Sequence, residues 1–237
     1  MKNWLSTLIN AILPARCLHC GKIIANDNCL CSECFEQISF ITKPYCIHCG
    51  TPLLNKSVSD LYCANCLNKK DNLRYSRSAV IYDEFSKKLI LDFKFFDHIE
   101  NKKLLAQWMF FAGKDIFDAG VDVILPIPLH YMRLLKRKYN QSAILSSELS
   151  KLTNIQADYK SLIKRKKTQP QAECSGKKRI TNIKNAFYVK YPDNIKGKRV
   201  LLIDDVYTTG STLRECAKVL KKAGAKSVDS LTVAKVC

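Results

Sequence analysis

Two adjacent acids and a run of hydroxyl side chains lie within nine residues of one another near the end of the chain. Asp204 and Asp205 follow the apolar run Val200–Ile203, and Thr208-Thr209-Gly210-Ser211-Thr212 comes shortly afterwards. Carboxylates can accept hydrogen bonds from the vicinal hydroxyls of a sugar. Hydroxyls and consecutive backbone N–H groups at a helix start can bind a phosphate. These residue types and their spacing therefore predict a site for a ribose phosphate.

The elements that must position these groups are a buried strand and a helix. The run Val200–Ile203 predicts a parallel strand that stops at the two acids, because branched apolar residues without alternation indicate burial on both faces. A helix is expected from the hydroxyl run to about Ala223. Open α/β sheets bind ligands where their strands end. The alternative is a capped turn with two surface acids, but adjacent carboxylates at a strand end are costly without a partner.

This segment resembles the phosphoribosyl pyrophosphate (PRPP) signature of type I phosphoribosyltransferases, which is a hydrophobic strand, Asp-Asp, two variable residues and Thr-Thr-Gly-[Ser/Ala]-Thr. Every position of that pattern is filled. The resemblance implies that Asp204 and Asp205 hold the ribose hydroxyls and, in a transferase, act as catalytic residues by stabilising positive charge on the sugar. It also implies Mg²⁺, which takes oxygen ligands from phosphates and carboxylates. The implied ligands of the 5′-phosphate are Thr208, Thr209, Gly210, Ser211 and Thr212.

Nine of the twelve cysteines lie before residue 67, and eight of them form four Cys-x-x-Cys pairs. Eight thiolates are the number that two tetrahedral zinc sites require, and such closed sites are structural. Joining neighbouring pairs closes shorter loops than a cross-brace, so it is favoured, although the spacing allows both. Cys29 is expected to be a spare thiol or a substitute for Cys31, and His19 and His48 are not expected to be ligands. The predicted zinc ligands are Cys17, Cys20, Cys31, Cys34, Cys46, Cys49, Cys63 and Cys66.

Strand and helix patterns alternate after about residue 75, which predicts an α/β domain. We therefore expect a module over residues 1–69, which contains a short amphipathic N-terminal helix and a double zinc ribbon, and a second domain over residues 70–237. Aromatic residues such as Trp108 and Phe111 are interpreted as core rather than as a surface for stacking nucleic-acid bases. The expected elements are strands at Ser78–Tyr82, Val121–Leu125 and Ser227–Val236, and helices at Glu84–Phe96 and Lys103–Phe117.

A second resemblance covers nearly the whole chain. The order Pro128-Leu129-His130, Arg133, a basic cluster and Tyr139-Asn140-Gln141-Ser142 is similar to the ComF family of competence and DNA-utilisation proteins. That family also has an N-terminal cysteine-rich zinc module. The resemblance implies a type I phosphoribosyltransferase-like parallel sheet flanked by helices. It nominates Pro128, Leu129, His130 and Arg133 for the pyrophosphate side of PRPP. Further residues that match in order are Arg165, Thr168, Gln171, Arg179, Asn182, Ala186 and Phe187.

The basic charge of the chain is concentrated in one segment. Residues 129–199 contain 18 basic and 4 acidic residues, a net +14 of the total +18, which favours a polyanionic partner. The run Lys164–Lys178 is predicted to be a mobile loop, and the resemblance places there the loop that closes over PRPP. A solvated basic loop is the alternative. Basic side chains here could shield a pyrophosphate or bind a nucleic-acid backbone. The candidates are Lys164, Arg165, Lys166, Lys167, Thr168, Gln171 and Arg179.

Three functions stay open. The favoured one, from the family resemblance and the basic segment, is a PRPP-binding ComF-type protein that assists uptake or handling of single-stranded DNA in natural transformation. The second is an active phosphoribosyltransferase with an unknown acceptor, whose pocket the helices between residues 84 and 117 would have to form. The third makes the zinc ribbons a docking platform for protein partners of a membrane DNA-import machine.

The expected location is cytoplasmic, with the inner face of the membrane as the alternative. No apolar run approaches membrane-spanning length, and Met1–Leu13 lacks the small-residue cleavage site of a signal peptide. A reducing compartment also agrees with reading cysteine pairs as metal ligands rather than as disulfides.

Overall fold

A computed structural model describes the chain over residues 14–53, 61–67, 71–95, 100–129, 139–165 and 185–237. The amphipathic helix expected at the N-terminus lies outside these residues. In the described part of the chain, no helix has the length and apolar character that crossing a membrane requires.

A four-stranded parallel sheet in the order β1-β6-β5-β2 forms the centre of the molecule. Because all neighbouring pairs are parallel, the four carboxyl ends meet at one edge. The strands predicted around residues 78–82, 121–125, 200–203 and 227–236 are confirmed. Their observed bounds are β1 (Ser76–Ile81), β2 (Val123–Pro126), β5 (Arg199–Tyr207) and β6 (Ser227–Lys235).

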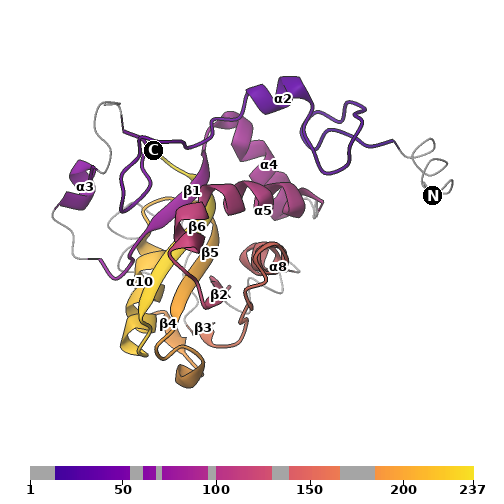
Figure 1. Cartoon of the computed structure of the whole chain (residues 1–237). Helices are drawn as coiled ribbons and strands as arrows, with labels where there is room; N and C mark the ends of the chain where they lie inside the picture. The colour runs from indigo at the N-terminus through magenta and orange to yellow at the C-terminus, as the bar shows by residue number, and fades with distance from the viewer. Residues whose placement is uncertain (1–13, 54–60, 68–70, 96–99, 130–138, 166–184) are drawn as a thin grey trace.

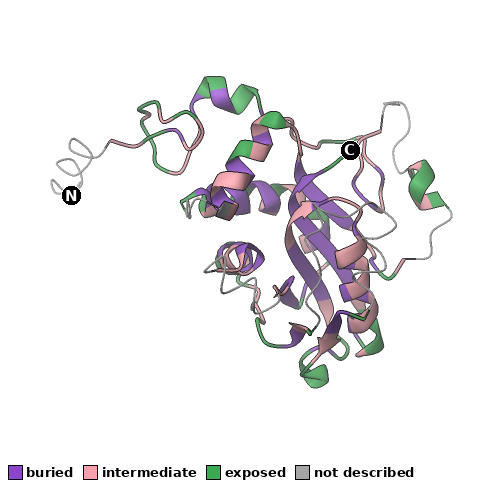
Figure 2. Cartoon of the chain, turned by 180° about the vertical axis from the view of Figure 1, so that it is seen from behind, coloured by how far each residue is buried: buried purple, intermediate pink, exposed green. Residues whose placement is uncertain are grey.

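Helices cover both faces of this sheet (Figure 1). On one face lie α4 (Glu84–Phe95), α5 (Asn101–Ala112) and α8 (Gln141–Thr153), and on the other lies α10 (Ser211–Lys222). The strands are buried between these layers, as Figure 2 shows. After residue 70, the domain also contains a short antiparallel ladder beside α10 and two short helical segments. These are β3 (Leu162–Lys164), β4 (Phe187–Val189), α6 (Lys114–Asp118) and η2 (Pro192–Asn194).

Strand β5 shows why its sequence lacks polar alternation. Leu201 and Ile203 pack in the core beneath α4, α5 and α8, whereas Val200 and Leu202 pack in the core beneath α10. All four side chains are fully buried. A strand that is covered on both faces needs apolar residues at every position.

One prediction about β5 is wrong, because the strand does not stop at the two acids. Asp204 still pairs with Thr232 of β6, and Tyr207 pairs with Lys235. The backbone of β5 continues its hydrogen-bonded ladder because the neighbouring strand β6 is equally long. The run of apolar side chains, by contrast, ends at Ile203. The acids therefore project from a strand and not from a loop.

The prediction of one continuous helix over Lys103–Phe117 is also wrong, since α5 ends at Ala112 and α6 begins at Lys114. Gly113 separates them where the chain passes close to the sheet. A Cβ at this position would lie 2.9 Å from Cδ2 of Leu231 in β6, which explains the glycine. Trp108 is buried as expected, but Phe111 is 73% exposed.

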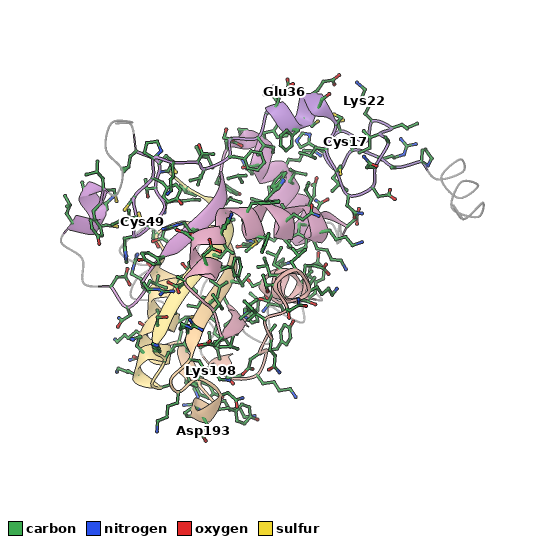
Figure 3. The ribbon with its side chains drawn as sticks, viewed as in Figure 1. Cys17, Lys22, Glu36, Cys49, Asp193 and Lys198 are labelled. Atoms are coloured by element: carbon green, nitrogen blue, oxygen red, sulfur yellow. The ribbon has the colours of Figure 1, made fainter. Side chains whose placement is uncertain are left out.

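The two cysteine-rich ribbons lie on opposite sides of the sheet domain (Figures 1 and 3). The first contains α2 (Ser32–Glu36) and lies beside α4, near the labelled Cys17. The second contains α3 (Ala64–Leu67) and lies near the C-terminal end of β6, close to the labelled Cys49. Each ribbon therefore has its own contact surface on the domain.

Candidate functional site

The signature residues gather at the carboxyl ends of the central strands. Pro126 at the end of β2 pairs with Ile203 in β5, directly before the acids. Beyond this point β5 leads through a tight turn into α10. A small hollow opens here, lined by Asp204, Val206, Tyr207, Thr208, Gly210, Ser211, Thr212 and Leu213.

The turn before α10 has the form of an anion-binding loop. Gly210 adopts φ 68°, and the hydroxyls of Thr209 and Ser211 lie 2.7 Å apart. The first N–H groups of a helix have no partner within the helix, and the helix dipole favours negative charge there. The predicted phosphate ligands, from Thr208 to Thr212, therefore come together around one helix start.

The turn has no room for a side chain at Gly210. A Cβ there would lie 2.4 Å from the hydroxyl oxygen of Tyr207 and 2.9 Å from Nη1 of Arg214. Arg214 donates to the Tyr207 hydroxyl at 3.3 Å and also to the carbonyl oxygen of Thr209. These two side chains support the loop from behind, and sequence reasoning did not single out either of them.

The two acids have different surroundings. Asp204 accepts a hydrogen bond at 3.1 Å from the Ser142 hydroxyl and another at 3.0 Å from the backbone N–H of Asp205. Burial, followed by the charge of Asp205, raises the pKa of Asp204 to about 7. Asp205 instead forms an ion pair with Lys94, whose Nζ lies 2.7 Å from Oδ2. The site can therefore change its charge near neutral pH.

The segment Tyr139-Asn140-Gln141-Ser142 attaches this site to α4 and β2. The Tyr139 hydroxyl donates to the carbonyl of Phe93 at 2.8 Å, and Nε2 of Gln141 donates to that of Lys94 at 3.0 Å. Asn140 caps α8 through the N–H of Ser142 and donates to Ile127 at 3.0 Å. The motif was visible in the sequence, but its role in holding Lys94 and Ser142 beside the acids was not.

The residues nominated for the pyrophosphate side are only partly described. Pro128 and Leu129 are half-buried at the end of β2. The preceding residue, Ile127, donates its N–H to Ile203 at 2.9 Å, which fixes the loop beside β5. His130 and Arg133 lie outside the described residues.

Of the basic run Lys164–Lys178, the structure describes the first two residues, Lys164 and Arg165. Nζ of Lys164 lies 5.3 Å from the centre of the Phe187 ring, and the Arg165 guanidinium lies 4.9 Å from that of Tyr188. Both contacts are across the β3–β4 ladder and have cation–π geometry. The other candidates, Lys166, Lys167, Thr168, Gln171 and Arg179, fall outside the described residues.

The cysteines form two groups of four, and neighbouring pairs are joined as favoured. The groups are Cys17, Cys20, Cys31 and Cys34, and then Cys46, Cys49, Cys63 and Cys66, with all Sγ atoms of a group within 4.8 Å of one another. A tetrahedron with Zn–S bonds of about 2.3 Å requires sulfur atoms about 3.8 Å apart.

The observed sulfur separations fit that requirement. Sγ of Cys20 lies 3.8 Å from Sγ of Cys31, and Sγ of Cys49 lies 3.6 Å from Sγ of Cys63. Burial opposes ionisation of Cys17, but the backbone N–H groups of Cys20 and Cys31 lower its pKa to about 6. The two groups are therefore suited to structural Zn²⁺, and Cys29 belongs to neither.

His19 and His48 each lie inside a Cys-x-x-Cys pair, here called a knuckle. Neither belongs to a group of four cysteines, and each instead contacts the sheet domain. The ring of His19 stacks on Phe85 of α4 with centroids 3.7 Å apart. His48 donates from Nδ1 to the Arg74 carbonyl at 3.1 Å, and its Nε2 lies 3.5 Å from Asp71. Each ribbon thus contacts the domain through the histidine that precedes the second cysteine of its first pair, His19 before Cys20 and His48 before Cys49.

The second ribbon also reaches the support of the anion-binding loop. Asp71 lies 4.0 Å from Nη1 of Arg214, and Nζ of Lys235 lies 3.6 Å from the centre of the Tyr207 ring. Lys235 is only 3% exposed, and burial lowers its pKa while Cys49 and neighbouring thiols oppose that shift. A continuous set of contacts therefore leads from the second cysteine group to the loop.

Family models match the two parts of the chain separately. A double zinc ribbon domain matches residues 8–67, and a phosphoribosyl transferase domain matches residues 134–236. Among solved structures, the glutamine PRPP amidotransferase from B. subtilis is similar with a TM-score of 0.40 and 18% identity, covering 60% of this chain and 30% of that one.

Curated relatives extend over nearly the whole chain. Competence protein F of Haemophilus influenzae is 35% identical over 221 residues, which cover 90% of this chain and 93% of that protein. The DNA utilization protein YhgH of Escherichia coli is 29% identical, with 91% and 95% covered. Competence protein ComFC of Bacillus subtilis is 28% identical, with 89% and 86% covered. With a double zinc ribbon followed by a phosphoribosyltransferase-like domain, and with this identity throughout, the chain belongs to the ComF family of competence and DNA-utilisation proteins.

Proposed function

We propose that the protein binds Mg²⁺·PRPP at the carboxyl edge of its sheet. The observation that carries this proposal is the convergence of an acid pair on β5 with a hydroxyl-rich loop at the start of α10. In this assignment the loop residues 208–212 bind the 5′-phosphate, and Asp204 and Asp205 bind the ribose hydroxyls. Carboxylate and phosphate oxygens suit Mg²⁺, which would neutralise charge on the bound ligand. Pro128, Leu129, His130 and Arg133 are assigned to the pyrophosphate side.

The biological role that we propose is assistance in the uptake or handling of single-stranded DNA during natural transformation. Relatives that match about nine-tenths of this chain are named for competence and for DNA utilization. The net charge of +14 over residues 129–199 supports a polyanionic partner. Lys164 and Arg165 lie over aromatic rings, an arrangement that suits contact with a nucleic-acid strand.

Transfer of phosphoribose from PRPP to an acceptor is the second candidate function. It is favoured by one observation, which is that α4 brings Lys94 onto Asp205 at the sugar site. Helix α4 belongs to the segment between residues 84 and 117, whose helices would have to form an acceptor pocket, and the contact between Lys94 and Asp205 supports that assignment. Departure of pyrophosphate leaves positive charge on the sugar, and the two carboxylates are placed to stabilise it.

The test is a calorimetric titration of the zinc-loaded protein with Mg²⁺·PRPP, with and without a short single-stranded oligonucleotide. We expect binding that is lost in the variant carrying Asp204→Asn and Asp205→Asn. A folded wild-type protein that does not bind PRPP would contradict the proposal. Release of pyrophosphate that depends on an added nucleobase would favour the transferase, whereas salt-sensitive oligonucleotide binding without turnover would favour the DNA-handling role.

The ribbons are proposed as a third element, a docking surface for protein partners of a DNA-import machine at the inner face of the membrane. Deletion of residues 1–66 that abolished a partner's binding and spared oligonucleotide binding would support it. If both were retained after deletion, the docking role would be excluded.

A further inference from the structure

Lys94 occupies the sugar site, although no sequence motif pointed to it. Its Nζ lies 2.7 Å from Oδ2 of Asp205, and the two side chains are only 21% and 14% exposed. An ion pair with so little exposure is screened by salt much less than a surface pair. The pair connects helix α4, far away in the sequence, with the acids on β5.

The position of Lys94 is fixed by hydrogen bonds to the end of its helix. Gln141 donates to the Lys94 carbonyl at 3.0 Å, and Tyr139 donates to the carbonyl of the fully buried Phe93 at 2.8 Å. One residue further along, the Ser142 hydroxyl donates to Asp204. One short segment therefore holds both the backbone of Lys94 and the side chain of Asp204, which places Lys94 beside the acid pair.

A nearby positive charge stabilises the ionised form of the acid pair. Burial and the charge of Asp205 disfavour the ionised form of Asp204, and the nearby charge of Lys94 offsets part of that cost. A divalent cation would be attracted to the same carboxylate oxygens. The ammonium of a lysine is a compact charge on a flexible four-carbon stem, so it can move away while its helix stays in place.

We propose that Lys94 is the counter-cation of the acid pair before ligand binds and that it releases the carboxylate of Asp205 when a phosphorylated sugar binds together with a divalent metal ion. The inference rests on the proposed function, because the ligand is taken to be Mg²⁺·PRPP. The pyrophosphate group of the ligand would give the Lys94 ammonium a new anionic partner. The Asp205 carboxylate would then be available to the divalent cation. Entry of the divalent cation is therefore coupled to binding of the sugar phosphate.

The first experiment uses Mn²⁺ alone as the probe, detected by electron paramagnetic resonance on the zinc-loaded full chain. Lys94→Met should bind Mn²⁺ at least about tenfold more tightly than the wild type, within the usual range of coupling between two sites. Lys88→Met is the matched control, because Lys88 belongs to the same helix and pairs with Asp92 at 3.2 Å. Adding Asp205→Asn to Lys94→Met should remove the gain.

Unchanged Mn²⁺ affinity in folded Lys94→Met would overturn the proposal, and so would an equal gain in Lys88→Met. If Lys94→Met does not fold, Lys94→Gln, which keeps a polar side chain of similar length, takes its place in the same titration. A thermal melt of each variant establishes that the comparison is made between folded proteins.

The second experiment measures the coupling itself. Saturating PRPP should tighten Mn²⁺ binding strongly in the wild type and at least about fivefold less in Lys94→Met, and Mn²⁺ should change PRPP affinity by the same factor. Equal coupling in both proteins would overturn the proposal. If the wild type does not bind PRPP at all, the proposed function fails, whereas a gain of Mn²⁺ affinity in Lys94→Met would still support Lys94 as the counter-cation.

Discussion

The two cysteine ribbons have the same knuckle, Cys-x-His-Cys, but different attachments to the domain. In the first ribbon, His19 stacks on Phe85, and Nζ of Lys88 donates to its carbonyl at 2.8 Å. In the second, the His48 carbonyl accepts from the N–H of Ser76 at 2.7 Å, so this ribbon is bonded to the start of β1. His19 of the first ribbon thus contacts a helix by ring packing and a lysine side chain, and His48 of the second contacts the sheet by a backbone hydrogen bond.

The electrostatic setting of the two histidines differs accordingly. Burial and the nearby charge of Lys88 lower the pKa of His19, whereas the hydrogen bond with Asp71 raises the pKa of His48. Asp71 in turn lies close to Arg214 beneath the anion-binding loop. The same motif therefore supports α4 in one ribbon and the proposed phosphate site in the other.

The largest effect is expected from removing one cysteine group at a time. Structural zinc sites contribute about 10–16 kcal/mol in isolated zinc-finger peptides, so each loss should unfold its own ribbon. Cys63→Ser with Cys66→Ser should increase amide hydrogen exchange in residues 71–77 and 207–214. Cys17→Ser with Cys20→Ser should do so in residues 84–95. Mass spectrometry measures the exchange in both proteins. An increase in the same segments of each would contradict the claim that the two ribbons support different parts of the domain.

Lys235→Met should weaken zinc retention in the second ribbon alone. Lys235 is buried beside Cys49, Cys63 and Cys66, and a zinc ion with four thiolates carries a net charge of −2 that this lysine offsets. Loss of such a supporting group typically costs about 10–100-fold in metal affinity. Competition with a chromophoric chelator should therefore release one of two zinc ions more readily.

The control for that variant is Lys22→Met in the first ribbon. Lys22 pairs with Glu33 at 2.7 Å, but both side chains are more than half exposed, so solvent screens the charge. Zinc release should match the wild type. Equal effects of the two lysines would show that burial does not distinguish the ribbons.

Arg214→Met tests the contact between the second ribbon and the anion-binding loop. Hydrogen bonds made by charged groups contribute about 1.5–3 kcal/mol, so Mg²⁺·PRPP affinity should fall at least about tenfold. Calorimetry gives the affinity, and hydrogen exchange over residues 207–212 should increase. Arg199→Met is the control at the other end of β5, where Arg199 pairs with Asp122 at 2.6 Å. If both variants bind equally well, the loop does not need this support.

The pH dependence of binding should come from the acid pair and not from either ribbon. Burial and the charge of Asp205 raise the pKa of Asp204 to about 7, so before ligand binds the Asp204 carboxyl is largely protonated below that pH. A metal-bound sugar favours the carboxylate form, and binding should therefore release a proton. Affinity should fall roughly tenfold from pH 7.5 to pH 6. Calorimetry in buffers of different ionisation enthalpy measures the proton, and Arg214→Met should retain the trend.

The smallest effect is expected from His19→Ala, which removes the stack on Phe85. Such ring pairs contribute about 0.5–1.5 kcal/mol beyond area burial, which lowers Tm by about 1–6 °C for a chain of this size. Thermal unfolding of the zinc-loaded protein measures this change. Mg²⁺·PRPP affinity should be unaltered, and a loss of affinity as large as that of Arg214→Met would remove the distinction between the ribbons.

Much of the fold and part of the site could be predicted because they depend on local pattern. The apolar run of β5 had to be buried on both faces, and the four knuckles had to supply eight thiolates. The spacing Asp-Asp-x-x-Thr-Thr-Gly-Ser-Thr placed the acids and the loop within one strand–turn–helix unit. The end of β5 could not be predicted in the same way, because backbone pairing follows the length of β6 rather than the polarity of Asp204 and Asp205.

The sequence alone therefore predicted a set of candidate functional residues in one segment, since close neighbours along the chain must be close in space. Tertiary structure alone decided which distant residues face them. It brought Lys94 to Asp205 and Ser142 to Asp204, and it placed Lys235 and Arg214 between the second ribbon and the loop. A lone lysine on an amphipathic helix carries no signal of its partner, because charge pairing across a fold depends on how helices pack on the sheet and not on spacing in the sequence.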